Sequence, residues 1–221
     1  ELTAAEELQE YIYRISGAKL ALINEDKAAD YKRYIFVGYS PEFGEKLGVE
    51  RPEDGDEGFT YRSVGDDLWI YGGKQRGTMY GVYSFLENEL GVRWYTKNCT
   101  KVPERDTWSF KKLNHSETPA VGIRQMDYFD AQDAAFLAHN KVNSIWNSQV
   151  NKYGNLVGYW RCHTFEHFVN SNKYFDSHPE YFSLRDGERK LLELLGNPQK
   201  QLKASEKIIK NPTKKNKNSA C

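Results

Sequence analysis

Four carboxyl side chains in the second half of the chain could act in acid–base chemistry: Asp127, Asp130, Asp133 and Glu166. Cleavage of a glycosidic bond, for example, needs one carboxyl as the acid and a second group that stabilises positive charge at the anomeric carbon. Asp130 and Asp133 precede a helical pattern and are expected to cap that helix. Asp127 should end a strand, where barrel proteins carry function, and it is the preferred candidate. The catalytic residues themselves stay unassigned.

Aromatic and planar polar residues near these carboxyls could bind a sugar, because sugar rings stack on aromatic side chains and sugar hydroxyls need planar donors and acceptors. For the aromatic residues the alternative is packing in the core. The predicted substrate-binding residues are Arg124, Asp127, Trp146, Asn147, His163, Glu166 and His167. Tyr159, Trp160 and Phe165 could add stacking surface.

One short motif offers a different chemistry. His163-x-x-Glu166-His167 has the spacing of the inverted zinc-protease motif, which places both histidines and the glutamate on one helical face. That interpretation requires a helix and a distal acidic ligand, and Gly158 with its aromatic neighbours argues against a long helix here. A histidine pair in a sugar-binding loop is the favoured interpretation. We predict neither a bound metal nor a cofactor.

The first half of the chain has a clear helix and strand pattern. Thr3 and Glu6 have capping-box spacing, apolar residues then recur at helical intervals, and Gly17 can cap the helix. A second helix is predicted from about residue 75 to 90, closed by Gly91. Strands are predicted at 19–24, 34–38, 59–64, 68–71 and 92–95, with 59–71 a hairpin and 41–58 an excursion loop.

The pattern changes in the second half. Residues 121–127 and 142–146 are strand candidates, and the helix between them should run to about Asn140. A strand, a helix and a strand in sequence favour parallel pairing through a crossover. Residues 191–209 could add a helix. The predicted divisions are 1–105 as a sheet-and-helix domain, 106–119 as a linker, 120–196 as a segment with parallel strand pairing and 197–221 as a Lys-rich tail.

Composition excludes some classes of partner. Lys plus Arg and Asp plus Glu balance at 31 each among 221 residues, so no net positive field would hold a nucleic acid. No run approaches the roughly 20 apolar residues that span a bilayer, and no membrane partner is expected. Cys99, Cys162 and Cys221 are too few and too widely spaced to define a disulfide framework or a zinc ribbon.

Three runs in the first 105 residues carry a family resemblance: Ala4–Tyr11, Gly72–Tyr83 and Leu90–Tyr95. They resemble the second domain of family 20 hexosaminidases and the amino-terminal domain of family 67 alpha-glucuronidases. Residues 138–146, 162–169 and 178–187 are similar to the start of the catalytic barrel in proteins of domain-of-unknown-function family 4838. The resemblance implies an α/β fold, with an accessory sheet-and-helix domain followed by an incomplete (β/α) barrel segment.

The resemblance implies a glycoside-hydrolase-like, carbohydrate-active protein of polysaccharide degradation that is secreted or periplasmic. A complete barrel needs roughly 200 residues or more, so we expect this chain to stop before the catalytic carboxylates of such a barrel. Family 20 enzymes have an arginine just after the first barrel strand, where this chain has Tyr128-Phe129-Asp130; Arg124 lies earlier. The alternative is a non-catalytic glycan-binding or scaffold module. The expected partner is a glycan, and an unclosed barrel edge predicts self-association.

Overall fold

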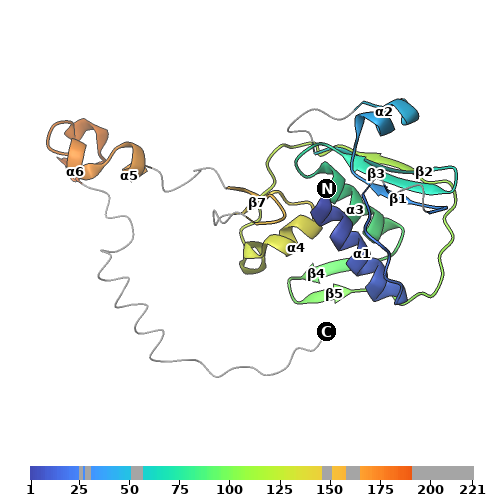
Figure 1. Ribbon diagram of the computed structural model, residues 1–221. Helices are drawn as coiled ribbons and strands as arrows, with labels where there is room; N and C mark the ends of the chain where they lie inside the picture. Colours follow the sequence, from blue (N-terminus) through green and yellow to red (C-terminus); the bar gives the residue numbers. More distant parts are fainter. Residues whose placement is uncertain (25–26, 28–30, 51–56, 146–150, 158–164, 191–221) are drawn as a thin grey trace, which may run out of the picture. The chain divides into compact units, whose positions relative to one another are not determined.

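The computed structural model describes residues 1–24, 27, 31–50, 57–145, 151–157 and 165–190. The chain divides into two compact units, Glu1–Gly158 and Tyr159–Cys221. In the first unit, helices α1 and α3 lie beside a twisted sheet, and the barrel-like segment with α4 and β7 follows (Figure 1). The two units are described separately below.

Helix α1 (Leu2–Ser16) buries one apolar face against the core, with Leu8, Ile12 and Ile15 each only 3% exposed. Gly17 ends the helix as predicted, in a left-handed conformation with φ of 72°. The predicted cap at Thr3 is wrong. The carbonyl oxygen of Glu1 accepts from the Ala5 amide at 3.0 Å, so Glu1 is the N-cap, two residues before Thr3, which lies inside the helix.

The main sheet has four strands in the order β1-β3-β2-β6. Its strands are β1 (Ile35–Val37), β2 (Phe59–Val64), β3 (Asp67–Gly72) and β6 (Asn114–Glu117). The predicted hairpin is confirmed as β2 and β3, which pair antiparallel around Gly65, while β1 runs parallel to β3. Strand β6 lies inside the predicted linker and pairs with β2, because a polar segment can still supply backbone hydrogen bonds to a sheet edge.

Two local predictions differ from the structure. Residues 19–24, which come after α1 in the chain, form no strand. The side-chain amide of Gln9 in α1 donates to the Leu20 carbonyl oxygen at 2.6 Å, so a helix side chain is a partner of this segment. Within the predicted loop lies helix α2 (Pro41–Leu47). The Ser40 hydroxyl caps α2 by accepting from the Phe43 amide at 3.3 Å. The seven residues of α2 are too few to show a helical period in the sequence.

Helix α3 (Gly77–Asn88) is the centre of the core. It is buried on all sides from Gly77 to Leu86, because it packs on the sheet, on α1 and on the later helix α4. Its first turn lies against the start of β2 and the end of β3, where a Cβ at Gly77 would lie 2.5 Å from the Gly58 carbonyl oxygen and 3.0 Å from the Gly72 carbonyl carbon. After the helix, β4 (Arg93–Thr96) and β5 (Cys99–Lys101) form a separate hairpin.

The barrel-like segment contains the 3-10 turn η2 (Phe129–Gln132), α4 (Ala134–His139), β7 (Ser144–Ile145) and β8 (Leu156–Val157). Asp133 caps α4 as predicted, accepting from the Phe136 amide at 2.8 Å. The predicted strand at 121–127 is reduced to one parallel bridge between Gln125 and Ser144, and β7 pairs parallel with β8. The sheets in the described part of the chain do not close into a barrel. This mixture of helices and open sheets agrees with the predicted fold class.

The second unit is described from Phe165 to Lys190. It contains α5 (Phe165–Phe168), α6 (Ser171–Tyr174), the 3-10 turn η3 (Pro179–Tyr181) and the hairpin of β9 (Leu184–Arg185) with β10 (Glu188–Arg189). The predicted helix at 191–209 and the Lys-rich tail lie outside the described residues. No helix in the described ranges has the length and apolar character needed to cross a membrane.

Candidate functional site

The strongest candidate site is the carboxyl edge of the parallel segments in the first unit. Gln125 pairs with Ser144, and Ser144 pairs in turn with Leu156, so three segments run in the same direction. In parallel sheets generally, functional residues lie at the carboxyl ends of the strands. Asp127 follows the first segment. Trp146 and Asn147 follow the second, but they lie outside the described residues.

Asp127 is exposed at this edge. Its Oδ1 accepts from the side-chain amide of Gln125 at 3.4 Å. The next two side chains are also exposed, Tyr128 by 48% and Phe129 by 82%. A carboxylate followed by exposed aromatic rings offers hydroxyl recognition and stacking together, which is the chemistry a sugar needs.

Arg124 has a different environment from Asp127. Its Nε donates to the Lys141 carbonyl at 2.8 Å and a terminal nitrogen donates to the Val121 carbonyl at 2.7 Å. The other terminal nitrogen binds the Glu57 carboxylate, and the guanidinium lies 5.7 Å from the centre of the Tyr80 ring. These contacts use all three nitrogens inside the protein, and the substrate role of Arg124 stays a prediction.

Glu57 is the centre of a buried polar network that joins the accessory domain to the barrel-like segment. Its side chain is 4% exposed, one oxygen binds Arg76, and the other binds Arg124 and the Asn143 amide, the last at 2.9 Å. Asn143 also accepts from the Arg124 amide and donates to the Gly122 carbonyl. Burial acts to raise the pKa of Glu57, but the hydrogen bonds from Arg124, Arg76 and Asn143 outweigh it and lower that pKa. The network therefore holds an ionised carboxylate.

A second network joins α1 to α4. The Glu7 carboxylate lies 3.1 Å from His139 Nε2 and accepts from Lys152 Nζ at 2.9 Å and from the Tyr153 hydroxyl at 3.3 Å. Burial acts to raise the pKa of Glu7, yet the hydrogen bonds from His139 and Lys152 prevail and lower it to about 2. The His139 ring stacks on Trp94 with 4.7 Å between centroids. Neither network was predicted from the sequence, because the residues that form each network lie far apart in the chain.

The remaining predicted residues belong to the second unit. His163 lies outside the described residues, and Glu166 is described only as part of the four-residue helix α5. His167 is exposed, with its ring 5.3 Å from that of Phe168. Among the residues that the structure describes, no group of three or more His, Cys, Asp or Glu could hold a metal ion.

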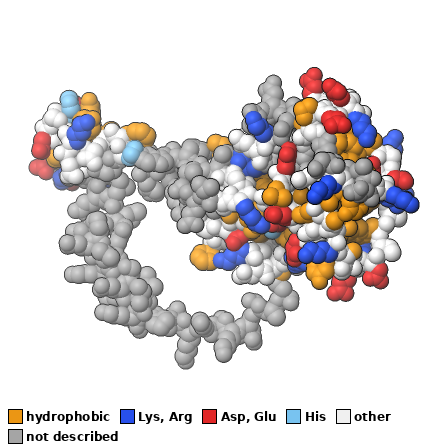
Figure 2. Space-filling view, viewed as in Figure 1, with side chains coloured by type: hydrophobic (Ala, Val, Ile, Leu, Met, Phe, Trp, Pro, Cys, Tyr) orange, Lys and Arg blue, Asp and Glu red, His pale blue; other side chains and the backbone are white. Residues whose placement is uncertain are grey.

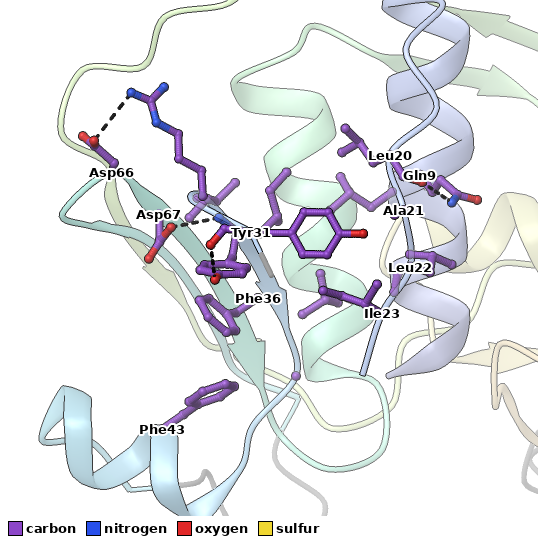
Figure 3. A pocket seen from close by; sticks show the side chains of 18 of the residues that line it. Gln9, Leu20, Ala21, Leu22, Ile23, Tyr31, Phe36, Phe43, Asp66 and Asp67 are labelled. Carbon is purple, nitrogen blue, oxygen red and sulfur yellow. Dashed lines mark hydrogen bonds and ion pairs between the residues drawn. The ribbon is translucent and has the colours of Figure 1, made fainter. Parts of the chain in front are cut away.

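A cavity of about 920 Å³ lies in the accessory domain, beside the free edge of β1. Figure 3 shows the Tyr31 ring pointing across it toward Leu22 and Ile23, with Phe36 and Phe43 on another side. Hydrophobic side chains are also visible among charged ones on the surface of this unit (Figure 2).

Two aspartates line the cavity, and each has a partner nearby. Asp67 accepts from the Tyr34 amide at 2.8 Å, and Asp66 lies 3.5 Å from Arg33 (Figure 3). These contacts hold the loop residues around the cavity and do not form a pair of carboxyls for catalysis.

Comparison with known proteins agrees with this architecture. Residues 2–85 match the model described as glycosyl hydrolase family 67 N-terminus, which confirms the predicted resemblance to glucuronidase-like accessory domains. No curated protein matches the chain. A similar solved structure is described as a family GH115 4-O-methyl-alpha-glucuronidase with specificity for decorated arabinogalactans.

The similarity to that glucuronidase is one of fold. The TM-score is 0.51 at 11% sequence identity, with 94% of this chain and 37% of the other chain covered. The chain thus spans little more than a third of the length of that structure. Residues 94–221, more than half of the chain, match the model described as domain of unknown function (DUF4838), and the chain therefore belongs to that family.

Proposed function

We propose that the chain belongs to a glycoside-hydrolase-like, carbohydrate-active protein of polysaccharide degradation and binds a glycan at the carboxyl edge around Asp127. The observation that carries the proposal is the position of Asp127, exposed after a parallel segment and followed by exposed Tyr128 and Phe129. The match of the accessory domain to the amino-terminal domain of family 67 glycosyl hydrolases supports it. The expected ligands are glucuronate-type or hexosamine-type glycans.

A glycan array of the whole chain tests this proposal. We expect the chain to bind acidic or hexosamine-containing glycans and the Asp127→Asn variant to lose at least about tenfold in affinity, because a charged hydrogen bond is worth roughly 1.5–3 kcal/mol. Asp66→Asn is the matched control, since Asp66 is 78% exposed in a surface ion pair. The absence of glycan binding, or equal binding by the wild type and Asp127→Asn, would contradict the proposal.

A non-catalytic glycan-binding module is the second candidate. It is favoured by the environment of Asp133, a candidate carboxyl that is engaged in capping α4. Hydrolysis needs two groups. Chromogenic α-glucuronides and hexosaminides distinguish the candidates, since turnover supports an enzyme, whereas glycan binding without turnover supports a module. Zinc analysis of the same protein tests the alternative based on His163, Glu166 and His167.

We also propose that the protein functions outside the cytoplasm. Cys99 is disulfide-bonded, and disulfides persist mainly in oxidising compartments such as the periplasm and the extracellular space. We expect Cys99, in protein isolated under non-reducing conditions, to resist maleimide labelling until a reductant is added. Complete labelling of Cys99 without reductant would remove this support.

A further inference from the structure

Strand β1 is an edge strand of the main sheet, and its own residues do not protect that edge. The sheet order places β1 at one end, beside β3. Edge strands are usually protected by charged residues, proline or a bulge, because an unpaired strand edge is a template for another chain. The sequence of β1 is Ile35-Phe36-Val37, which contains neither a charged residue nor a proline, and its pairing with β3 is regular.

The backbone of β1 has hydrogen-bonding groups on its outer side. The Tyr34 carbonyl oxygen accepts from an amide of β3 at 3.1 Å, and the Gly38 amide donates to a carbonyl of β3 at 2.9 Å. Alternate residues of a parallel strand direct their backbone groups to opposite sides, so Ile35 and Val37 direct theirs away from β3. No other strand of the described sheet lies on that side.

The cavity of about 920 Å³ follows this outer side on both faces of the sheet. Val37 packs against the core that contains Leu8 of α1, whereas Phe36 packs on the other face, its ring 4.6 Å from that of Phe43 in α2. Leu8 and Phe43 both line the cavity. Since successive side chains of a strand point to opposite faces, one extended chain would fill both halves of the cavity.

The wall on the far side of the cavity is apolar and partly exposed. Leu22 is 45% exposed and Ile23 is 39% exposed, and the Tyr31 ring points across the cavity toward them (Figure 3). A strand between β1 and this wall would remove that apolar surface from water. Because the wall bounds the cavity, a single strand fits there, whereas a second copy of this chain would bring a whole sheet with it.

The charges around the cavity indicate which strand fits. Among the described residues that line it, the charged side chains are three carboxylates and one guanidinium: Glu1, Asp66, Asp67 and Arg33. Asp66 lies 3.5 Å from Arg33, and the Asp67 carboxylate accepts from a neutral backbone amide. The cavity is therefore acidic overall, which favours a partner with lysine or arginine.

We propose that the outer side of β1 binds an extended, apolar strand of another protein that carries basic residues at its ends. The strand completes the hydrogen bonds of Ile35 and Val37 and places its side chains alternately on the two faces of the sheet. This is strand addition at a sheet edge, in which the main chain supplies affinity and the side-chain pockets supply specificity. The interaction is independent of glycan binding at the edge around Asp127.

The test uses a capped eight-residue peptide of valine and isoleucine with a lysine at each end. Hydrogen exchange of the Ile35 and Val37 amides is followed by NMR in the whole chain. We expect both amides to exchange rapidly in the free protein and at least about tenfold more slowly with saturating peptide. The same peptide, N-methylated at alternate residues, keeps its side chains but cannot complete the ladder, and should bind at least about tenfold more weakly.

A substitution in the far wall tests the apolar part of the site. Leu22→Asp places a charge where an apolar strand would pack and should weaken the lysine-capped peptide at least about tenfold. Ile123→Asp is the matched control, because Ile123 is 50% exposed and does not line the cavity, and it should leave binding unchanged. Unchanged thermal midpoints establish that both variants keep the fold.

Four outcomes would overturn the proposal. Slow exchange of both amides in the free, dilute protein would mean that the edge is already covered. Protection that grows with the concentration of the protein alone would identify a second copy as the occupant. Equal binding of the two peptides would show an unspecific apolar cavity, and equal weakening by Leu22→Asp and Ile123→Asp would show a general effect of charge.

Discussion

The carboxylate of Glu57 binds the guanidinium of Arg124, a residue 67 positions later in the sequence. Glu57 lies two residues before the first strand residue of the hairpin, Phe59, whereas Arg124 belongs to the first parallel segment of the barrel-like part. The Glu57 side chain is 4% exposed and that of Arg124 is 19% exposed. The accessory domain and the barrel-like segment therefore share a buried charge pair.

Glu57→Gln should destabilise the first unit. The substitution leaves the guanidinium groups of Arg76 and Arg124 buried without their carboxylate, and removing one partner of a buried pair costs about 3–5 kcal/mol. Urea unfolding, followed by tryptophan fluorescence, measures the change. Asp66→Asn removes an exposed pair with Arg33 and should change stability by less than about 1 kcal/mol. Similar losses in both variants would show that the buried network has no special role.

The pKa of Glu7, about 2, predicts a dependence of stability on acid. Because this pKa lies below the ordinary value of 4.5, the ionised carboxylate stabilises the folded chain fully above about pH 4.5. That contribution should be lost progressively as the pH falls from 4.5 toward 2. Urea midpoints of the wild type and of Glu7→Gln should therefore converge over this interval. A constant difference between the two proteins from pH 6 to pH 2.5 would disprove the assignment.

Gly77→Ala should destabilise the packing of α3 on β3. A Cβ at this position would lie 2.5 Å from the Gly58 carbonyl oxygen, and backbone cannot move away as a flexible side chain could. Overpacking of this kind costs roughly 1–3 kcal/mol. Gly122→Ala is the control, because a Cβ there meets nothing within 4 Å, and its stability should change by less than about 0.5 kcal/mol. The thermal midpoints of the two variants give the comparison.

The parallel pair of β7 and β8 predicts self-association. Strand β7 lies between the Gln125 bridge and β8, β8 has no second partner strand among the described residues, and unpaired strand edges favour pairing with another chain. We expect the apparent mass from light scattering to rise with protein concentration. A constant monomer mass across a hundredfold range of concentration would refute this prediction.

Local sequence signals predicted several elements well. The hairpin at β2 and β3 follows from the turn residues that begin at Gly65, and the cap of α4 follows from Asp133 placed just before a helical pattern. The same reasoning failed for residues 19–24, whose apolar run suggested a strand. In that segment a side chain of α1 binds the Leu20 carbonyl, a contact that no local pattern reveals.

The sequence by itself determined the β2–β3 hairpin, the cap of α4 and the family, because caps and turns depend on residues within a few positions of each other. Only the tertiary structure decided which side chains meet. It placed Asp127 at an exposed edge, Arg124 in a buried network and Lys97 over Phe129. The physical reason is the range of the interactions: Glu7 and His139 lie 132 positions apart, and their contact requires the folded core that brings α1 and α4 together.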